Sequence, residues 1–297
     1  MIEKFNFYDV YGYFVPGAAF IAILWLPFGL VRHAWPSSTW SGAIIAAVLA
    51  YIGGHLIQSL ATNALPSRDN EGRFPSETYL DPDDKELPSM CKKNIQELVD
   101  TQFGLKLEVD KKGNDAIDKQ RHNAFLLARQ ILIQGKAASY AEQSQGMYAL
   151  TRGLVSVLFL TFAYWLGFAA PAFVRQCVAT TAILLGLTVS LLVLANLSLV
   201  LLETHPLPLT KRRMELGYSI VLVLACLLIG YALGLHCQVS QRYGTLLLFL
   251  SAWAFIAALR AYGAYKSFAG QFAATVWRDY LAYNVSVSLH QKSDDTR

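Results

Sequence analysis

The chain has 297 residues, of which 54% are hydrophobic and only 15% are charged, and its net charge is +4. A typical soluble domain carries about 25% charged residues, and a mean hydropathy of +0.35 is too high for a single soluble core. This composition excludes an ordinary soluble globular protein. It predicts a membrane protein, because the hydrocarbon layer, roughly 30 Å thick, requires helices of about 20 apolar residues.

Six apolar segments of suitable length predict an all-α, polytopic bundle of about six transmembrane helices. In chain order these segments are 14–31, 41–60, 153–170, 178–202, 217–236 and 244–259. The first has Pro16 near its start, where a helix tolerates proline, and Pro27 where the helix should kink or end. A re-entrant or interfacial form of this first segment is therefore an open alternative.

A polar insertion, residues 62–150, separates the second and third spans. Its first part, 62–88, holds four prolines and many charges, which predicts a loop. Apolar residues then recur at helical spacing from Ser89 to Phe103, where Gly104 predicts a stop, and again after Asn114 or Asp115, either of which can cap the next helix. We therefore expect a mostly helical insertion.

The predicted organisation has four parts. They are an N-terminal interfacial segment with the first two spans (1–61), the helical insertion (62–150), the other four spans (151–260) and an amphipathic C-terminal helix with its tail (261–297). Only three of the 25 Lys and Arg residues, Arg32, Arg175 and Arg242, lie in the loops opposite the insertion. Because short cytoplasmic loops carry an excess of Lys and Arg, we expect the insertion and both termini to face the cytoplasm.

The four cysteines show no CxxC spacing, so they predict neither a zinc site nor a redox motif. Cys177 and Cys237 fall in predicted outer loops. In an oxidising compartment these two residues could form a disulfide, and two unrelated thiols are the alternative.

Catalytic motifs of the HExxH, Walker A, GxSxG and Rossmann types are missing from the sequence, and the predicted spans hold no paired carboxylates. We therefore expect a protein that is not an enzyme, with no cofactor and no metal site. We also expect no direct binding of nucleic acid.

A few polar or small residues inside the spans are candidates for function. His55 and Gln58 lie three residues apart in the second span, and Asn196 lies in the fourth. Such groups are costly in lipid, so they either form interhelical hydrogen bonds or line a pore or a ligand pocket. Gly230 and Gly234 form a GxxxG pattern, which predicts close helix contact within one subunit or between subunits.

The sequence FYDVYGYFVPG, residues 7–17, combines an aromatic–Asp pair, a Gly-Tyr pair and a Pro-Gly pair ahead of the first span. This stretch of about a dozen residues resembles the start of a loose group of poorly characterised bacterial multi-pass membrane proteins. Some members of that group are encoded beside antiviral defence genes. The resemblance implies a protein of the bacterial inner membrane with a role in defence.

These features lead to one functional hypothesis and two alternatives. The hypothesis is an oligomeric membrane effector that alters permeability when the cytoplasmic part receives a signal or a partner. The first alternative is a channel or transporter for a small solute, and the second is a scaffold that anchors a soluble partner through residues 62–150. The expected partners are the lipid bilayer, further copies of the chain and a cytoplasmic protein.

Overall fold

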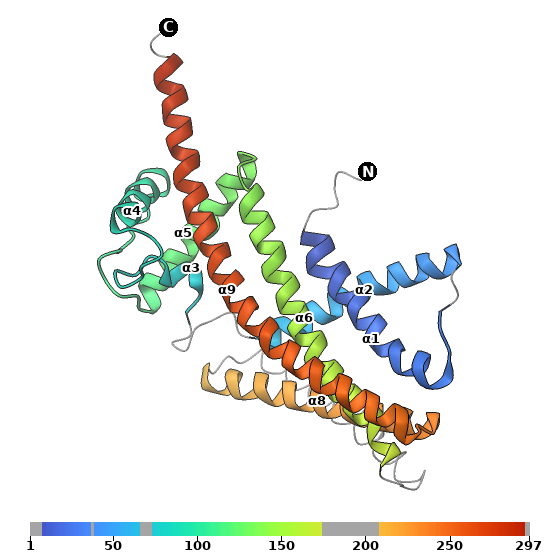
Figure 1. The fold of residues 1–297 in the computed structure, drawn as a ribbon. Coiled ribbons are helices and arrows are strands. Elements are labelled where there is room, and N and C mark those ends of the chain that lie inside the picture. The colour runs from blue at the N-terminus through green and yellow to red at the C-terminus, as the bar shows by residue number, and fades with distance from the viewer. Residues whose placement is uncertain (1–7, 37–38, 66–72, 174–207, 295–297) are drawn as a thin grey trace. The chain divides into compact units, whose positions relative to one another are not determined.

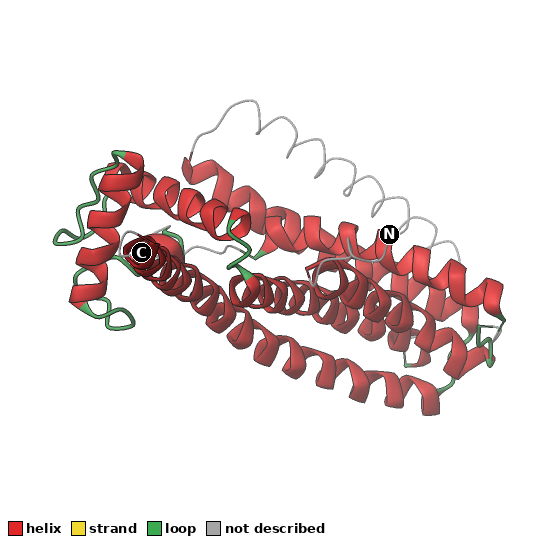
Figure 2. Ribbon diagram, turned by 90° about the horizontal axis from the view of Figure 1, so that it is seen from above, coloured by secondary structure: helices red, strands yellow, loops and turns green. Residues whose placement is uncertain are grey.

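A computed structural model describes residues 8–36, 39–65, 73–173 and 208–294 (Figure 1). These residues form helices and loops and contain no strand (Figure 2), which confirms the predicted all-α class. The elements are η2 (Asp9–Phe14, a π-helix), α1 (Val15–Arg32), α2 (Trp40–Ala64), α3 (Pro75–Thr78), α4 (Ser89–Phe103), α5 (Asp115–Gln134), α6 (Ser139–Ala169), η3 (Ala170–Ala172), α8 (Pro208–Cys237) and α9 (Gln241–Asp294).

Five helical stretches in the described residues are long and apolar enough to cross a membrane, judged by length and composition. They are Asp9–Arg32, Trp40–Thr62, Ser139–Ala172, Ile220–Cys237 and Gln241–Ser288. They coincide with five of the six predicted spans, and the predicted span 178–202 lies outside the described residues. The chain therefore has the helices of a multi-pass membrane protein.

The chain forms two compact units. As far as these ranges are described, the first unit contains Asp9–Leu65 and Ala149–Gly263, and the second contains Pro66–Tyr148 and Ala264–Arg297. Helices α6 and α9 each contribute residues to both units. The first unit holds most of the apolar helices, and the second holds α3, α4 and α5.

In the first unit, α1 and α2 approach each other so closely that glycine is required at the contact. A Cβ added to Gly17 would collide with the carbonyl oxygen of Ala50 and the backbone nitrogen of Gly54. Gly54 in turn lies against the backbone of Tyr13. Small residues thus let these two helices and the π-helix pack backbone to backbone.

Pro27 does not end α1, which continues to Arg32. Because proline has no N–H, the carbonyl of Ile23 loses its usual helical partner four residues on. The indole Nε1 of Trp165 in α6 donates a hydrogen bond to this carbonyl, with 3.1 Å between the two atoms. Next to it, the hydroxyl of Tyr164 donates to the carbonyl of Leu24 at 3.3 Å. Helix α6 therefore supplies the donor that the proline removes.

The second unit has its own core, centred on Trp277 of α9. Trp277 and Tyr280 are fully buried, and they belong to one apolar cluster with Ile95 of α4 and Phe125 of α5. The Trp277 indole donates to the carbonyl of Ser76 at 3.3 Å, which fixes the start of α3 against α9. The polar insertion is thus a folded unit with a core, to which the end of α9 contributes.

The ends of α4 and α5 follow the sequence signals. Helix α4 ends at Gly104, whose φ of 65° is the left-handed conformation that favours glycine. Helix α5 begins after Asn114, whose Oδ1 accepts hydrogen bonds from the N–H groups of Ala116 and Ile117 at 3.1 and 3.0 Å. Of the two predicted capping residues, the structure selects Asn114.

Replacing Gly17 with Ala is expected to destabilise the first unit by about 1–3 kcal/mol, because the added methyl group meets backbone atoms that cannot move aside. Gly263→Ala is the matched control, since a Cβ at Gly263 meets nothing within 4 Å. This control should leave stability unchanged or raise it by up to about 1 kcal/mol through helix propensity. Thermal unfolding of the purified protein in detergent measures both variants, and equal midpoints would contradict the close contact at Gly17.

Candidate functional site

Gln58, one of the predicted polar residues, is a buried junction of three helical elements in the first unit. Its Nε2 donates to the carbonyl oxygens of Gly12 in η2 and Ala149 in α6, both at 2.6 Å. Its Oε1 accepts from Nε and Nη2 of Arg152 at 3.1 and 2.9 Å. A glutamine amide has two N–H donors and one oxygen acceptor, and these contacts use all of them. The geometry gives Gln58 the contacts of an interhelical hydrogen-bonding group.

His55, three residues earlier in α2, has a different environment. Its side chain is exposed and stacks on Tyr13, with ring centroids 3.9 Å apart and an interplanar angle of 19°. The ring of Tyr51 meets it edge to face, with centroids 4.7 Å apart. His55 therefore belongs to an aromatic cluster beside η2, whereas Gln58 is buried.

Gly230 and Gly234 of α8 lie against α6. A Cβ on Gly230 would collide with the carbonyl oxygen of Tyr164, and a Cβ on Gly234 would collide with that of Phe168. The structure thus places the GxxxG pattern at a close helix contact within one chain.

Of the three remaining predicted site residues, only Cys237 lies in the described part of the chain. Cys237 is buried at the end of α8. Its proposed disulfide partner, Cys177, lies outside the described residues, as does Asn196. The disulfide and the role of Asn196 remain predictions.

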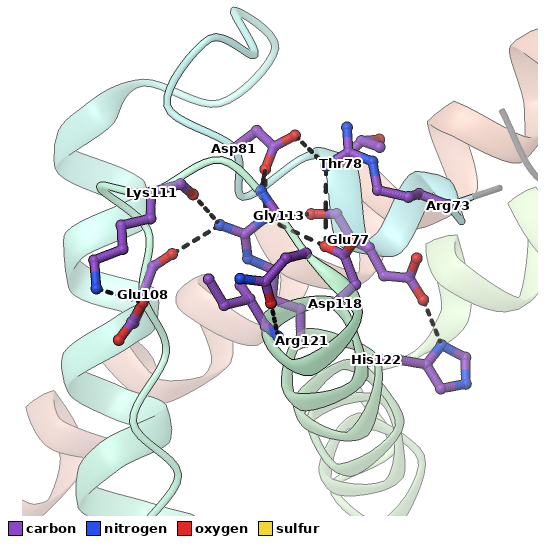
Figure 3. A network of polar contacts seen from close by, with 12 residues as sticks. Arg73, Glu77, Thr78, Asp81, Glu108, Lys111, Gly113, Asp118, Arg121 and His122 are labelled. Atoms are coloured by element: carbon purple, nitrogen blue, oxygen red, sulfur yellow. Dashed lines mark hydrogen bonds and ion pairs between the residues drawn. The ribbon is translucent and has the colours of Figure 1, made fainter. Parts of the chain in front are cut away.

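A network of buried charges in the second unit was not predicted from the sequence (Figure 3). Its centre is Arg121 of α5, whose side chain is fully buried. Nη1 of Arg121 donates to Oδ1 of Asp81 and to the carbonyl of Glu77, the latter at 3.2 Å. Nη2 donates to the carbonyls of Glu108 and Lys111 at 2.7 and 2.9 Å. One guanidinium thus holds two loops against α5.

The carboxylate of Asp81 is the nearest anionic partner of Arg121, and the carboxylate of Asp118 lies further away, 3.8 Å from Nη1 of Arg121. Its Oδ2 accepts from Nη1 of Arg73 at 2.7 Å, and its Oδ1 also accepts from the N–H of Gly113 at 3.0 Å. Burial alone would raise the pKa of Asp81. The hydrogen bonds from Arg121, Arg73 and Gly113 outweigh burial and hold this pKa below its ordinary value. Asp81 is therefore ionised at neutral pH.

A buried ammonium group fixes the loop that follows Asp81. Lys92 of α4 is only 3% exposed. Its Nζ donates to the backbone carbonyls of Asp81 and Asp84, the latter at 2.7 Å. The loop between α3 and α4 therefore curves around this amine.

One sequence signal pointed to the network. Arg121 lies four residues after Ile117 and three before Ala124, so it interrupts the apolar face of α5. A charged residue on the buried face of a helix needs a partner. The sequence alone does not identify that partner, because Asp81 lies 40 residues before Arg121.

A half-open cavity of about 170 Å³ lies beside the network, within the second unit. One polar residue of its lining is His122, whose Nδ1 lies 3.7 Å from Oε1 of Glu77. The residues that line the cavity are Phe74, Pro75, Ser76, His122, Phe125, Tyr148, Ala269, Phe272 and Ala273.

Replacing Arg121 with Met is expected to destabilise the second unit by about 3–5 kcal/mol, because Asp81 then stays buried without its main cation. The double variant Arg121→Met/Asp81→Asn removes both charges and should recover part of this loss. Hydrogen–deuterium exchange of residues 115–134 reports the effect locally.

The control for this experiment is Lys111→Met. The Lys111–Glu108 ion pair has an N–O distance of 3.0 Å, and its side chains are 68% and 45% exposed. Breaking such a pair should cost less than about 1 kcal/mol. If Arg121→Met exchanged no faster than Lys111→Met, the network would not stabilise the unit.

The depressed pKa of Asp81 predicts a pH dependence. In the unfolded chain this carboxyl titrates near its ordinary value of 3.8. Its contribution to stability is therefore complete well above that pH and is lost as the pH falls through the lower pKa of the folded state. Acid unfolding followed by tryptophan fluorescence should show this loss. In Asp81→Asn the decline below about pH 4 should be shallower, and identical acid profiles would refute the assignment.

Neither a metal site nor a match to a known protein indicates the function of these sites. Within the described residues, no three His, Cys, Asp or Glu side chains are grouped so that they could hold a metal ion. No protein-family model, curated protein or solved structure matches the chain. The function is therefore inferred from the residues themselves.

Proposed function

We propose that this protein is an oligomeric membrane effector, in which the second unit receives a signal or a partner and the apolar helices respond by changing membrane permeability. The observation that carries this proposal is that α6 and α9 each belong in part to both units. A rearrangement of the second unit therefore acts on two helices that also supply apolar spans.

Helix α9 is the longer of these two helices. It has 54 residues, whereas a membrane span needs only about 20 residues. Its first part supplies Leu247 and Ala254 to an apolar cluster of the first unit. Its later part supplies Trp277 and Tyr280 to the core of the second unit. One helix thus takes part in both cores.

The second unit has the features expected of a domain that receives a signal or a partner. A simple linker between spans would not need a fully buried arginine with four hydrogen-bonded acceptors. Burying charges is costly unless each one is paired, so such a network favours one defined conformation. A defined conformation is what a signal or partner can recognise and shift.

Exposed apolar surface supports the membrane and oligomer parts of the proposal. In α2, Ile44, Leu49 and Leu56 are 62%, 50% and 60% exposed. In α9, Phe249 and Trp253 are 61% and 55% exposed. Water does not tolerate continuous apolar surface of this kind, so lipid and neighbouring copies are the proposed covers.

The proposal places the second unit and both termini in the cytoplasm of a bacterium. The distribution of Lys and Arg among the loops supports this orientation. The N-terminal resemblance of residues 7–17 supports the inner membrane and a role in antiviral defence.

Membrane potential in bacterial cells tests the effector function. Induced expression during phage infection should cause a potential-sensitive dye to report depolarisation, and Lys111→Met should behave like the unchanged protein. Arg121→Met should lose the response while still inserting in the membrane, because only the receiving unit is disrupted.

The other outcomes separate the alternative functions. A dye signal that never changes would eliminate the effector. Steady solute flux in liposomes without any trigger would favour the channel or transporter. A stoichiometric soluble partner, with no conductance in liposomes, would favour the scaffold.

A further inference from the structure

We infer that the second unit binds a small, neutral aromatic molecule with a hydrogen-bonding group, of which phenol is the simplest example. The site is the cavity lined by the start of α3, by α5, by Tyr148 of α6 and by Ala269, Phe272 and Ala273 of α9. The inference deepens the proposed function and rests on it in one respect: the bound molecule is then the signal that this unit receives.

The size of the cavity sets the size of the ligand. Protein interiors are close-packed and contain few voids larger than a water molecule. This half-open cavity measures about 170 Å³, a volume similar to that of an enclosed engineered cavity of about 150 Å³ that binds benzene in another protein. On α9, Ala269 and Ala273 leave this space because their side chains are single methyl groups. The cavity therefore has space for one six-membered ring with a small substituent.

The walls of the cavity are the faces and edges of aromatic rings. Four of the lining residues are phenylalanine or tyrosine: Phe74, Phe125, Tyr148 and Phe272. Phe125 and Phe272 meet edge to face, with centroids 5.8 Å apart and an interplanar angle of 87°. Aromatic rings prefer edge-to-face or offset packing with one another. The aromatic ring of a bound ligand can therefore pack against these side chains with the same edge-to-face geometry.

His122 gives the site a polar edge. Its imidazole stacks on Phe74, with centroids 5.3 Å apart and an interplanar angle of 28°. Glu77 lies 3.7 Å from its Nδ1 (Figure 3), and Glu77 is itself held by the N–H of Phe74, which donates to Oε2 at 2.7 Å. An imidazole can donate or accept a hydrogen bond. A ligand hydroxyl on this side would find an oriented partner.

The charges around the cavity favour a neutral ligand over a cation. Aromatic walls can also attract an ammonium group. The residues that line this cavity, however, include no carboxylate. The guanidinium of Arg129 already lies over the ring of Phe272, 5.9 Å from its centroid. The nearby carboxylate of Glu77 already contacts the imidazole of His122 and the N–H of Phe74, so a second cation would meet the positive charge of Arg129 at this wall.

Calorimetry with the full-length protein in detergent tests the site with phenol, toluene and tetramethylammonium, each also titrated into empty micelles. Phenol should bind saturably and about tenfold more tightly than toluene, the effect of one hydrogen bond. Ala269→Phe fills the cavity and should weaken phenol binding at least tenfold. Ala282→Phe, at an exposed position of the same helix, should bind phenol unchanged.

His122→Phe provides a test that does not depend on overall stability. It keeps an aromatic ring beside Phe74 but removes the hydrogen bond, so the preference for phenol over toluene should fall to about one. The ratio is measured within a single variant, so partial unfolding affects both ligands equally.

Several results would overturn the inference. They are binding by tetramethylammonium that is tighter than binding by phenol, equal phenol affinity in Ala269→Phe and Ala282→Phe, and phenol uptake no greater than that of empty micelles. Depolarisation without phenol binding would remove this site but leave the effector function standing. Phenol binding without any permeability change would support the site and contradict the effector function.

Discussion

A backbone carbonyl that leaves the helical hydrogen-bond pattern finds no water to bond inside a membrane, and the packing of the first unit answers that constraint. Pro27 removes the helical donor for the carbonyl of Ile23, and Trp165 of α6 replaces it. Gln58 adds hydrogen bonds to carbonyls of η2 and α6. Each unsatisfied group in hydrocarbon would cost several kcal/mol. These side chains therefore determine which helices are neighbours, and close glycine contacts bring the helices near enough for the bonds to form.

The second unit meets the same requirement with charges. Its loops expose carbonyls that no regular element pairs, and the cations of Arg121 and Lys92 reach them from two helices. Asp81 then neutralises the arginine. Because breaking one partner leaves the other buried and unpaired, this network tolerates few alternative arrangements. The network therefore holds the second unit in one well-defined arrangement.

Local sequence patterns predict many of the helices, whereas the candidate sites depend on contacts between residues that are far apart in the sequence. Apolar periodicity gave the helix from Ser89 to Phe103, and capping chemistry narrowed the start of α5 to Asn114 or Asp115. The pairing of Arg121 with Asp81 is different, because no periodic pattern relates a helix to a loop 40 residues earlier. His55 and Gln58 show a related limit. Their spacing in α2 does not reveal that Gln58 is buried against η2 and α6, whereas His55 stacks on Tyr13 at an exposed position.

The position of the cavity on α9 connects ligand chemistry to the proposed response. Ala269 and Ala273 face the cavity from a helix whose earlier part, with exposed Phe249 and Trp253, has the surface of a membrane span. A ligand can shift an equilibrium only through contacts that differ between two states. A ring packed against Ala269 and Ala273 makes its contacts on that same helix. In the proposed function, the binding energy would therefore act on a helix that also supplies one of the five long apolar stretches.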